Sequence, residues 1–358
     1  MLHKFSNLIK HSTHITTIIF IGGFIFDMIM LPDINHPLTR YIGLAHLCVV
    51  AFLILFREWI VSRNTASLIE QKIYSISTFG ISFSSGAALS FLSVYSIRSA
   101  EFSVSWPLFI FLFLCIVANE IVSTHSFRFT LDVGVLLVAS LFYLIFNIPV
   151  FLKVQNDVTF SISVGVSIVI SFLYLYFLQF TSESARYEAP RSYALAIGIP
   201  MFVFMLYFLN VIPAVPLSLK DSGIYHSVVH TSTGEFIAQK ENDNRNFLYF
   251  RTPIYHYSPP DTGVYFFSAV SAPGELSAPL SHVWEKYNEK TKQWEGGETI
   301  PISLIGGREG GYRAYSKKEN ISPGLWRVTV KVDSMRVVGR LKFWVENGSL
   351  NDLQEIKL

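Results

Sequence analysis

Long apolar runs fill the first 219 residues of the chain, and short alternating apolar and polar positions fill the remainder. The run from Tyr193 to Leu219 contains no charged residue. A helix of that length, at about 1.5 Å per residue, crosses a hydrocarbon core of about 30 Å. Lys220 ends this run, and beyond it the apolar period becomes the two-residue alternation of strands. The pattern predicts a transmembrane helical domain over residues 1–219 and an extracytoplasmic β-domain over residues 220–358.

The apolar runs predict about seven transmembrane helices, and the charged residues that flank them predict their orientation. With the N-terminus inside, eight Lys and Arg flanks are cytoplasmic and three lie outside, which is the usual positive-inside bias. An odd number of spans then places the β-domain on the far side, the periplasm of a bacterial inner membrane. The expected spans cover residues 13–31, 40–57, 73–97, 104–123, 129–151, 159–180 and 192–215.

Strand-like segments separated by Gly, Pro, Asn and Asp turns occupy the C-terminal part and predict an all-β, sandwich-like domain. In the segment GLWRVTVKV, alternate side chains should face the core and the residues between them should face water. The core-facing residues expected there and in the last strand are Trp326, Val328, Val330, Val332, Leu341, Phe343 and Val345.

Several segments of the C-terminal part resemble a known family. They are FLNVIPAVPLSLKDSGIYHSV, HVWEKY, GGREGGYRAYSKK, GLWRVTVKV and GRLKFWVEN. The chain resembles bacterial multi-span membrane proteins that carry the domain of unknown function DUF2914, best over about residues 210–347. The resemblance implies the β-domain and the membrane region before it. Because the family has no agreed activity, it implies no site residue.

Composition excludes several classes of function. The C-terminal 139 residues hold 17 of the 28 Lys and Arg and 16 of the 26 Asp and Glu, so the basic footprint of a nucleic-acid-binding domain is absent. Cys48 and Cys115 lie in apolar runs, so we expect small core residues and neither a disulfide nor zinc. The chain has no phosphate-binding loop, nucleophile elbow or zinc-protease motif. We therefore expect no catalytic residues, no metal and no cofactor.

Polar residues near the outer membrane face form the first candidate site. Asp27, Asp33, His36 and His46 fall within the first span, the following loop and the second span. Carboxylates and imidazoles gathered there suit cation binding, proton relay or acid/base chemistry. An ionisable group inside a span is costly to keep, and this cost favours a functional interpretation. The alternative is that Asp27 accepts hydrogen bonds from a neighbouring helix and the loop residues are solvated.

Two further polar groups have a structural interpretation. On the third span, small and hydroxyl residues from Thr78 to Ser93 favour close helix packing, with a water-lined path as the alternative. On the cytoplasmic side we expect ion pairs rather than chemistry. The residues concerned are Glu120, His125, Arg128, Asp132, Glu183, Arg186, Glu188 and Arg191.

Histidines and aromatic residues supply the candidates of the β-domain. His226 and His230 are four residues apart on an expected strand, about 13 Å, so they cannot share a metal ion. Trp344 should lie on the solvent face of its strand beside Arg340 and Lys342, where an exposed ring can stack on sugars or anchor a partner. The residues predicted to bind a ligand or partner are Trp284, Tyr312, Tyr315 and Trp344.

These observations lead to two hypotheses of function. In the first, the chain is a non-enzymatic inner-membrane protein whose periplasmic β-sandwich binds an envelope protein or glycan, with the lipid bilayer as its other partner and no nucleic acid. In the second, it is a membrane enzyme or an ion- or proton-coupled transporter that uses the outer Asp and His residues.

Overall fold

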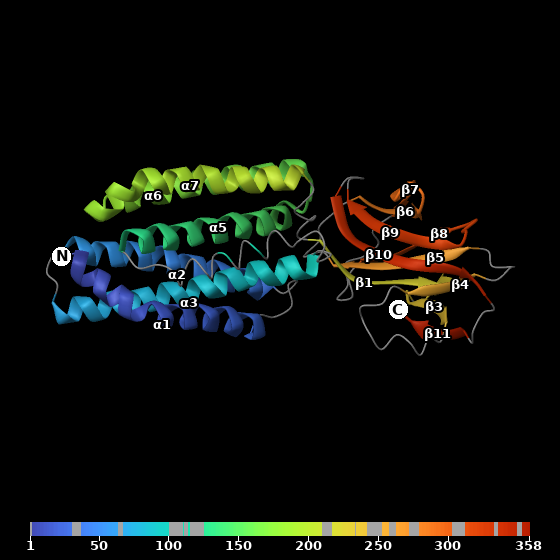
Figure 1. Cartoon of the computed structure of the whole chain (residues 1–358), viewed down its shortest axis with the longest axis horizontal. Helices are drawn as coiled ribbons and strands as arrows, with labels where there is room; N and C mark the ends of the chain where they lie inside the picture. The colour runs from blue at the N-terminus through green and yellow to red at the C-terminus, as the bar shows by residue number, and fades with distance from the viewer. Residues whose placement is uncertain are drawn as a thin grey trace. The chain divides into compact units, whose positions relative to one another are not determined.

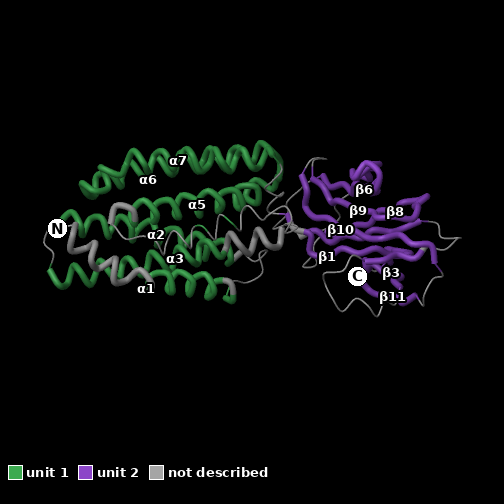
Figure 2. Tube along the Cα trace, in the orientation of Figure 1, with its two compact units in different colours: residues 1–97, 102–215 green, residues 98–101, 216–358 purple. Residues whose placement is uncertain are grey.

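The computed structural model divides the chain into two compact units (Figure 2), residues 1–97 with 102–215 and residues 98–101 with 216–358. The first unit is helical and the second is built of strands (Figure 1). The residues that the structure describes are 2–30, 37–63, 67–99, 110, 114, 125–209, 217–232, 234–241, 253–257, 263–271, 279–302, 312–332, 336–348 and 353–358.

Six helices lie in the described part of the first unit, one fewer than the seven spans expected. The expected span over residues 104–123 falls outside the described residues, apart from positions 110 and 114. Within the described residues, four segments are long and apolar enough to cross a membrane: Leu38–Ser62, Arg128–Leu152, Asp157–Leu178 and Glu183–Phe208. The helices are α1 (Leu2–Met30), α2 (Pro37–Ser62), α3 (Leu68–Ser99), α5 (His125–Leu152), α6 (Asp157–Leu178) and α7 (Glu183–Phe208).

Glycines bring α1 and α3 into direct backbone contact. A Cβ atom added to Gly23 of α1 would overlap the carbonyl oxygen of Phe83, and one added to Gly86 of α3 would overlap that of Phe20. At Gly22, by contrast, an added Cβ would meet nothing within 4 Å. Small residues allow this approach, as expected for the third span, and it fixes the register of the two helices.

Local signals in the sequence fix where the last two helices begin. Asn156 precedes α6 and forms a capping box with Thr159, whose backbone N–H lies 2.8 Å from the Asn156 Oδ1 atom. Ser182 precedes α7 and accepts a hydrogen bond from the backbone N–H of Ala185. Both caps satisfy amide groups that a helix start leaves without intrahelical partners.

Three sheets make up the described part of the second unit. Their strand orders are β1-β5-β8, β4-β10-β9-β6-β7 and β11-β3-β2, and every pair is antiparallel except β4 with β10. The strands are β1 (Ser218–Tyr225), β2 (Ser227–His230), β3 (Phe236–Glu241), β4 (Ile254–Tyr257), β5 (Val264–Ser271), β6 (Leu280–Asn288), β7 (Gln293–Ile302), β8 (Tyr312–Lys318), β9 (Gly324–Val332), β10 (Arg336–Asn347) and β11 (Leu353–Lys357).

The alternation in β9 and β10 orients the five-stranded sheet. Trp326, Val328, Val330 and Val332 are buried as expected. Phe343 and Val345 of β10 are buried too, whereas Leu341 is only partly buried. One expectation on the other face is wrong: Thr329 is 1% exposed, because Val283 and Arg340 flank it on the neighbouring strands.

Candidate binding site

Asp27 lies in a buried polar contact between three helices. The Ser90 hydroxyl on α3 donates a hydrogen bond to its Oδ2 atom at 2.9 Å, and Nε2 of His46 on α2 lies 3.7 Å from its Oδ1 atom. Asp27 is 2% exposed. Asp33 and His36 lie outside the described residues. The described contacts thus bring two of the four predicted residues together and add Ser90.

A larger ionic network lies inside the helical unit and joins α2 to α5. Nη1 of Arg57 donates to Oδ2 of Asp132 at 2.5 Å, and Nε of Arg128 lies 3.2 Å from Oδ1 of the same carboxylate. Nη2 of Arg128 donates to the Ser82 hydroxyl on α3 at 2.6 Å. All four side chains are at most 4% exposed. Asp132 therefore bridges two buried arginines.

Glu58 extends this network to α7. Nε of Arg57 lies 3.6 Å from Oε1 of Glu58, and Oε2 of Glu58 accepts hydrogen bonds from the hydroxyls of Ser182 and Ser184. The expected ion pairing of Arg128 and Asp132 is present, but both residues are buried rather than on a solvated face. The sequence did contain a signal for Arg57 and Glu58: adjacent opposite charges interrupt an apolar run.

The four aromatic residues predicted to bind a partner differ in exposure. Trp284 is 1% exposed and Tyr312 is 8% exposed, so the expectation that their rings are partly exposed is wrong. Tyr315 on β8 is 39% exposed and Trp344 on β10 is 36% exposed. Trp284 faces inward, where its ring packs against the buried rings of Phe266 and Phe343. Trp344 and Tyr315 remain as candidates.

A polar core beneath Trp284 has a structural role. His282 forms hydrogen bonds of 2.8 Å with the hydroxyls of Ser268 and Ser316, and Nε1 of Trp284 donates to Ser316 at 3.1 Å. His282 is fully buried, and this burial lowers the pKa of the imidazole to about 3. The ring therefore stays neutral near neutral pH. A serine beside a histidine suggests a nucleophile, but substrate cannot reach a buried pair.

The outer face of the five-stranded sheet carries charged and aromatic side chains. Arg327 on β9 is the centre: its Nε and Nη2 atoms donate to the two carboxylate oxygens of Glu285 at 2.6 and 2.9 Å, and its guanidinium lies 4.4 Å from the ring centre of Trp294. These hydrogen bonds, together with the positive charges of Arg327, Lys331 and Arg340, lower the pKa of Glu285. We call the set Glu285, Trp294, Arg327, Lys331, Arg340, Lys342 and Trp344 the outer face.

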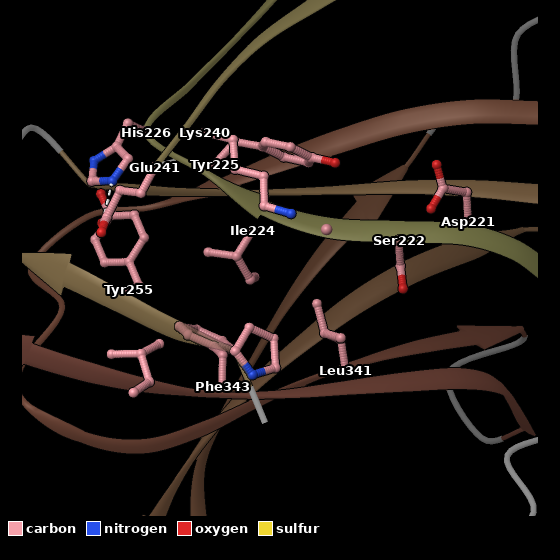
Figure 3. A pocket seen from close by; sticks show the side chains of 13 residues that line it. Asp221, Ser222, Ile224, Tyr225, His226, Lys240, Glu241, Tyr255, Leu341 and Phe343 are labelled. Atoms are coloured by element: carbon pink, nitrogen blue, oxygen red, sulfur yellow. Dashed lines mark hydrogen bonds and ion pairs between the residues drawn. The ribbon is translucent and has the colours of Figure 1, made fainter. Parts of the chain in front are cut away.

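A cleft of about 200 Å³ opens between β1, β3, β4 and β10 (Figure 3). Glu241 lies at one end, with Oε1 2.8 Å from Nε2 of His226 and Oε2 2.5 Å from Nδ1 of His256. The ring of His226 stacks on Tyr255 at 4.2 Å. Lys240 also lines the cleft. The Glu241 carboxylate at the end of β3 thus contacts β4 through His256 and the junction of β1 and β2 through His226.

Metal binding finds no support in the described residues, where no three His, Cys, Asp or Glu side chains are placed to hold an ion. His226 contacts Glu241, whereas the ring of His230 packs against Phe236 at 4.7 Å. His226 immediately precedes β2 and His230 ends it, so the two imidazoles contact different residues.

Comparison with known proteins identifies a family for part of the second unit. Residues 277–345 match the model of the family described as "Protein of unknown function (DUF2914)", which confirms the resemblance over β6 to β9 and most of β10. No curated protein matches the chain. The solved structure of Pseudomonas fluorescens alkylpurine DNA glycosylase AlkC bound to DNA containing an abasic site analog aligns over 87% of this chain and 100% of its own, at 10% identity. Its TM-score is 0.19, so this likeness carries no argument about fold or function.

Proposed function

We propose that the chain is an integral inner-membrane protein whose β-rich unit binds an envelope component, a protein or a glycan, without catalysing a reaction. Trp344 carries this proposal. Its large ring is 36% exposed on a regular strand, next to the exposed Lys342 and the partly exposed Arg340. An exposed tryptophan beside cations is the kind of anchor that binding surfaces use.

The membrane placement rests on helix length and flanking charge. Four helices in the part of the chain that the structure describes are long and apolar enough to span a bilayer. Seven spans with the N-terminus inside best fit the distribution of Lys and Arg. This topology puts the β-rich unit, which we propose to be a sandwich, in the periplasm. Alkaline phosphatase and a fluorescent cytoplasmic reporter, fused separately after Lys220 and after Leu358, test it. Phosphatase activity at both points is expected, and fluorescence at both would refute a periplasmic unit.

Binding is tested by a photo-crosslinking amino acid placed at Trp344 in the full chain in living cells. Irradiation should give a discrete adduct with an envelope component. The same residue placed at Leu353 is the matched control, because it is a similarly exposed position on a strand of another sheet, at 39%. Equal labelling at both positions, or none at Trp344, would count against a binding role for this surface.

A second candidate function rests on Asp27. This carboxylate is buried at 2% exposure among three helices and faces His46, and ionisable groups inside membrane helices commonly serve transport or proton transfer. Proteoliposomes of the full chain, loaded with a pH-sensitive dye, test it. Faster dissipation of an imposed pH gradient by the wild type than by Asp27→Asn would support an ion- or proton-coupled role. Equal rates would refute it.

A further inference from the structure

The outer face is organised as neighbouring cross-strand rows. Glu285, Arg327 and Lys342 stand opposite one another on β6, β9 and β10. The next row contains Arg340, opposite Thr329, so two cations are two residues apart along β10. Adjacent strands lie about 4.8 Å apart. Three charged residues therefore stand in one row, and Arg340 adds a fourth charge in the next row.

Aromatic rings lie on both sides of these two rows. Trp294 is on the edge strand β7, next to Tyr287 at 5.2 Å between ring centres, and the Arg327 guanidinium stacks on it. Trp344 is on β10, three strands away in the order β7-β6-β9-β10. Three strand spacings amount to about 14 Å. Trp294 stands opposite Tyr287 and Trp344 opposite Leu325, while Arg327 and Lys342 stand in the neighbouring row. An extended ligand that crosses the strands would meet a ring at each end and cations along one side.

Positive charge exceeds negative charge on this face. Four cations, Arg327, Lys331, Arg340 and Lys342, lie there with the carboxylate of Glu285, and Glu346 lies further along β10. Arg327 is paired with Glu285. Lys342 is exposed and makes no ion pair within the described residues. The excess of positive charge on the outer face favours an anionic partner.

From this arrangement we propose that the outer face binds an anionic polysaccharide, with sugar rings stacked on Trp294 and Trp344 and acidic groups held by Lys342 and Arg340. This inference rests on the proposed binding function and names its ligand class. Two stacking rings with a row of cations beside them match a polymer of sugar rings that carry carboxylate or phosphate groups. A lipid surface would instead favour a continuous apolar patch with basic residues around it.

The test measures binding of the full chain in nanodiscs to immobilised polygalacturonate. Fully methyl-esterified polygalacturonate is the matched probe, because it keeps the sugar backbone and removes the charge. Phosphomannan, a polymer of sugar rings that carry phosphate, distinguishes phosphate from carboxylate as the anion. We expect binding to at least one anionic polymer, at least tenfold weaker binding to the ester, and weaker binding at higher salt because exposed charges are screened.

Variants locate the binding surface. Trp344→Ala and Lys342→Gln should each weaken polygalacturonate binding about tenfold, the size expected for an anchoring residue. Leu353→Ala is the control for loss of an exposed apolar side chain on another sheet, and Lys290→Gln is the control for loss of an exposed positive charge on a turn. Both controls should bind as the wild type does.

The outcomes separate this inference from the proposed function. Equal binding of the polymer and its ester, or loss of binding in Leu353→Ala but not in Trp344→Ala, would overturn the inference and leave an envelope-binding protein. Binding to phosphatidylglycerol vesicles but to neither polymer would also overturn it, in favour of a lipid surface. A Trp344 crosslink to a protein with no polymer binding would retain the proposed function alone.

Discussion

Asp132 should be the most sensitive charged position of the helical unit. Its carboxylate is 4% exposed and lies between two guanidinium groups, 2.5 Å from Nη1 of Arg57 and 3.2 Å from Nε of Arg128. In Asp132→Asn the amide oxygen can still accept one of these hydrogen bonds. The amide nitrogen would then face the other arginine, and two hydrogen-bond donors would point at each other. Both guanidinium groups would also lose the negative charge of Asp132.

The size of the effect follows from the number of contacts. Removing one partner of a buried ion pair costs roughly 3–5 kcal/mol, chiefly because the other charge stays buried without compensation. Asp132 serves two arginines, which raises the loss, whereas Glu58 remains 3.6 Å from Nε of Arg57 and offsets part of it. We therefore expect Asp132→Asn to lower the free energy of unfolding by about 4 kcal/mol.

Unfolding of the full chain in mixed micelles, with increasing sodium dodecyl sulfate and circular dichroism at 222 nm, measures this loss. Glu183→Gln is the control, since Glu183 is exposed in the first turn of α7 and its loss should cost less than about 1 kcal/mol. Arg57→Met should cost less in the Asp132→Asn background than in the wild type, because Arg57 has then already lost its main partner. A loss below about 1 kcal/mol for Asp132→Asn would refute the idea that this carboxylate compensates two buried charges.

Three other predictions concern packing, a buried hydrogen bond and a titration. Gly23→Ala should prevent α1 and α3 from packing and lower the yield of folded protein, whereas Gly22→Ala should be harmless, as size-exclusion chromatography of the two variants would show. Ser90→Ala should cost about 1–3 kcal/mol in the same unfolding assay, because the buried Asp27 side chain loses a hydrogen-bond donor, and an unchanged stability would refute a stabilising role for this contact. Since burial holds the pKa of His282 at about 3, below its ordinary 6.5, the unfolded chain takes up a proton that the folded chain does not, and stability should fall between pH 6.5 and 3. The slope should reach about 1.4 kcal/mol per pH unit in urea unfolding followed by tryptophan fluorescence, and His282→Asn should lack it.

Periodicity was sufficient to predict the two kinds of secondary structure. Apolar runs without charge allowed the helices to be placed, and the alternation of β9 identified its inner face, because burial follows the two-residue period directly. It was insufficient where both faces of a strand are covered. In β6 every residue from Leu280 to Trp284 is buried, so alternation gave no information on which way Trp284 points.

The polar sites were harder to predict because they depend on pairing between distant segments. Arg57 and Asp132 are 75 positions apart, and nothing local in the sequence relates them. Glu241 contacts His226 and His256 only through the register of strands that belong to different sheets. The Asp27 contact with His46 was predicted more successfully, because a short connection places the end of one helix beside the start of the next.

The reciprocal glycine contacts of α1 and α3 have a consequence for biogenesis. The backbones of these two helices pack directly against each other at the glycines. Several hydroxyl side chains of α3 are also buried in the helical unit, Ser82 and Ser90 among them. Among the described residues, α3 does not belong to the four helices that are long and apolar enough to span a bilayer. On the proposed topology, α3 would therefore be retained there by its fit to α1, which the ribosome has already delivered to the insertion machinery. Errors at Gly23 or Gly86 would then appear as low cellular abundance, through quality-control proteolysis of unassembled chains, rather than as an altered activity of the protein that survives.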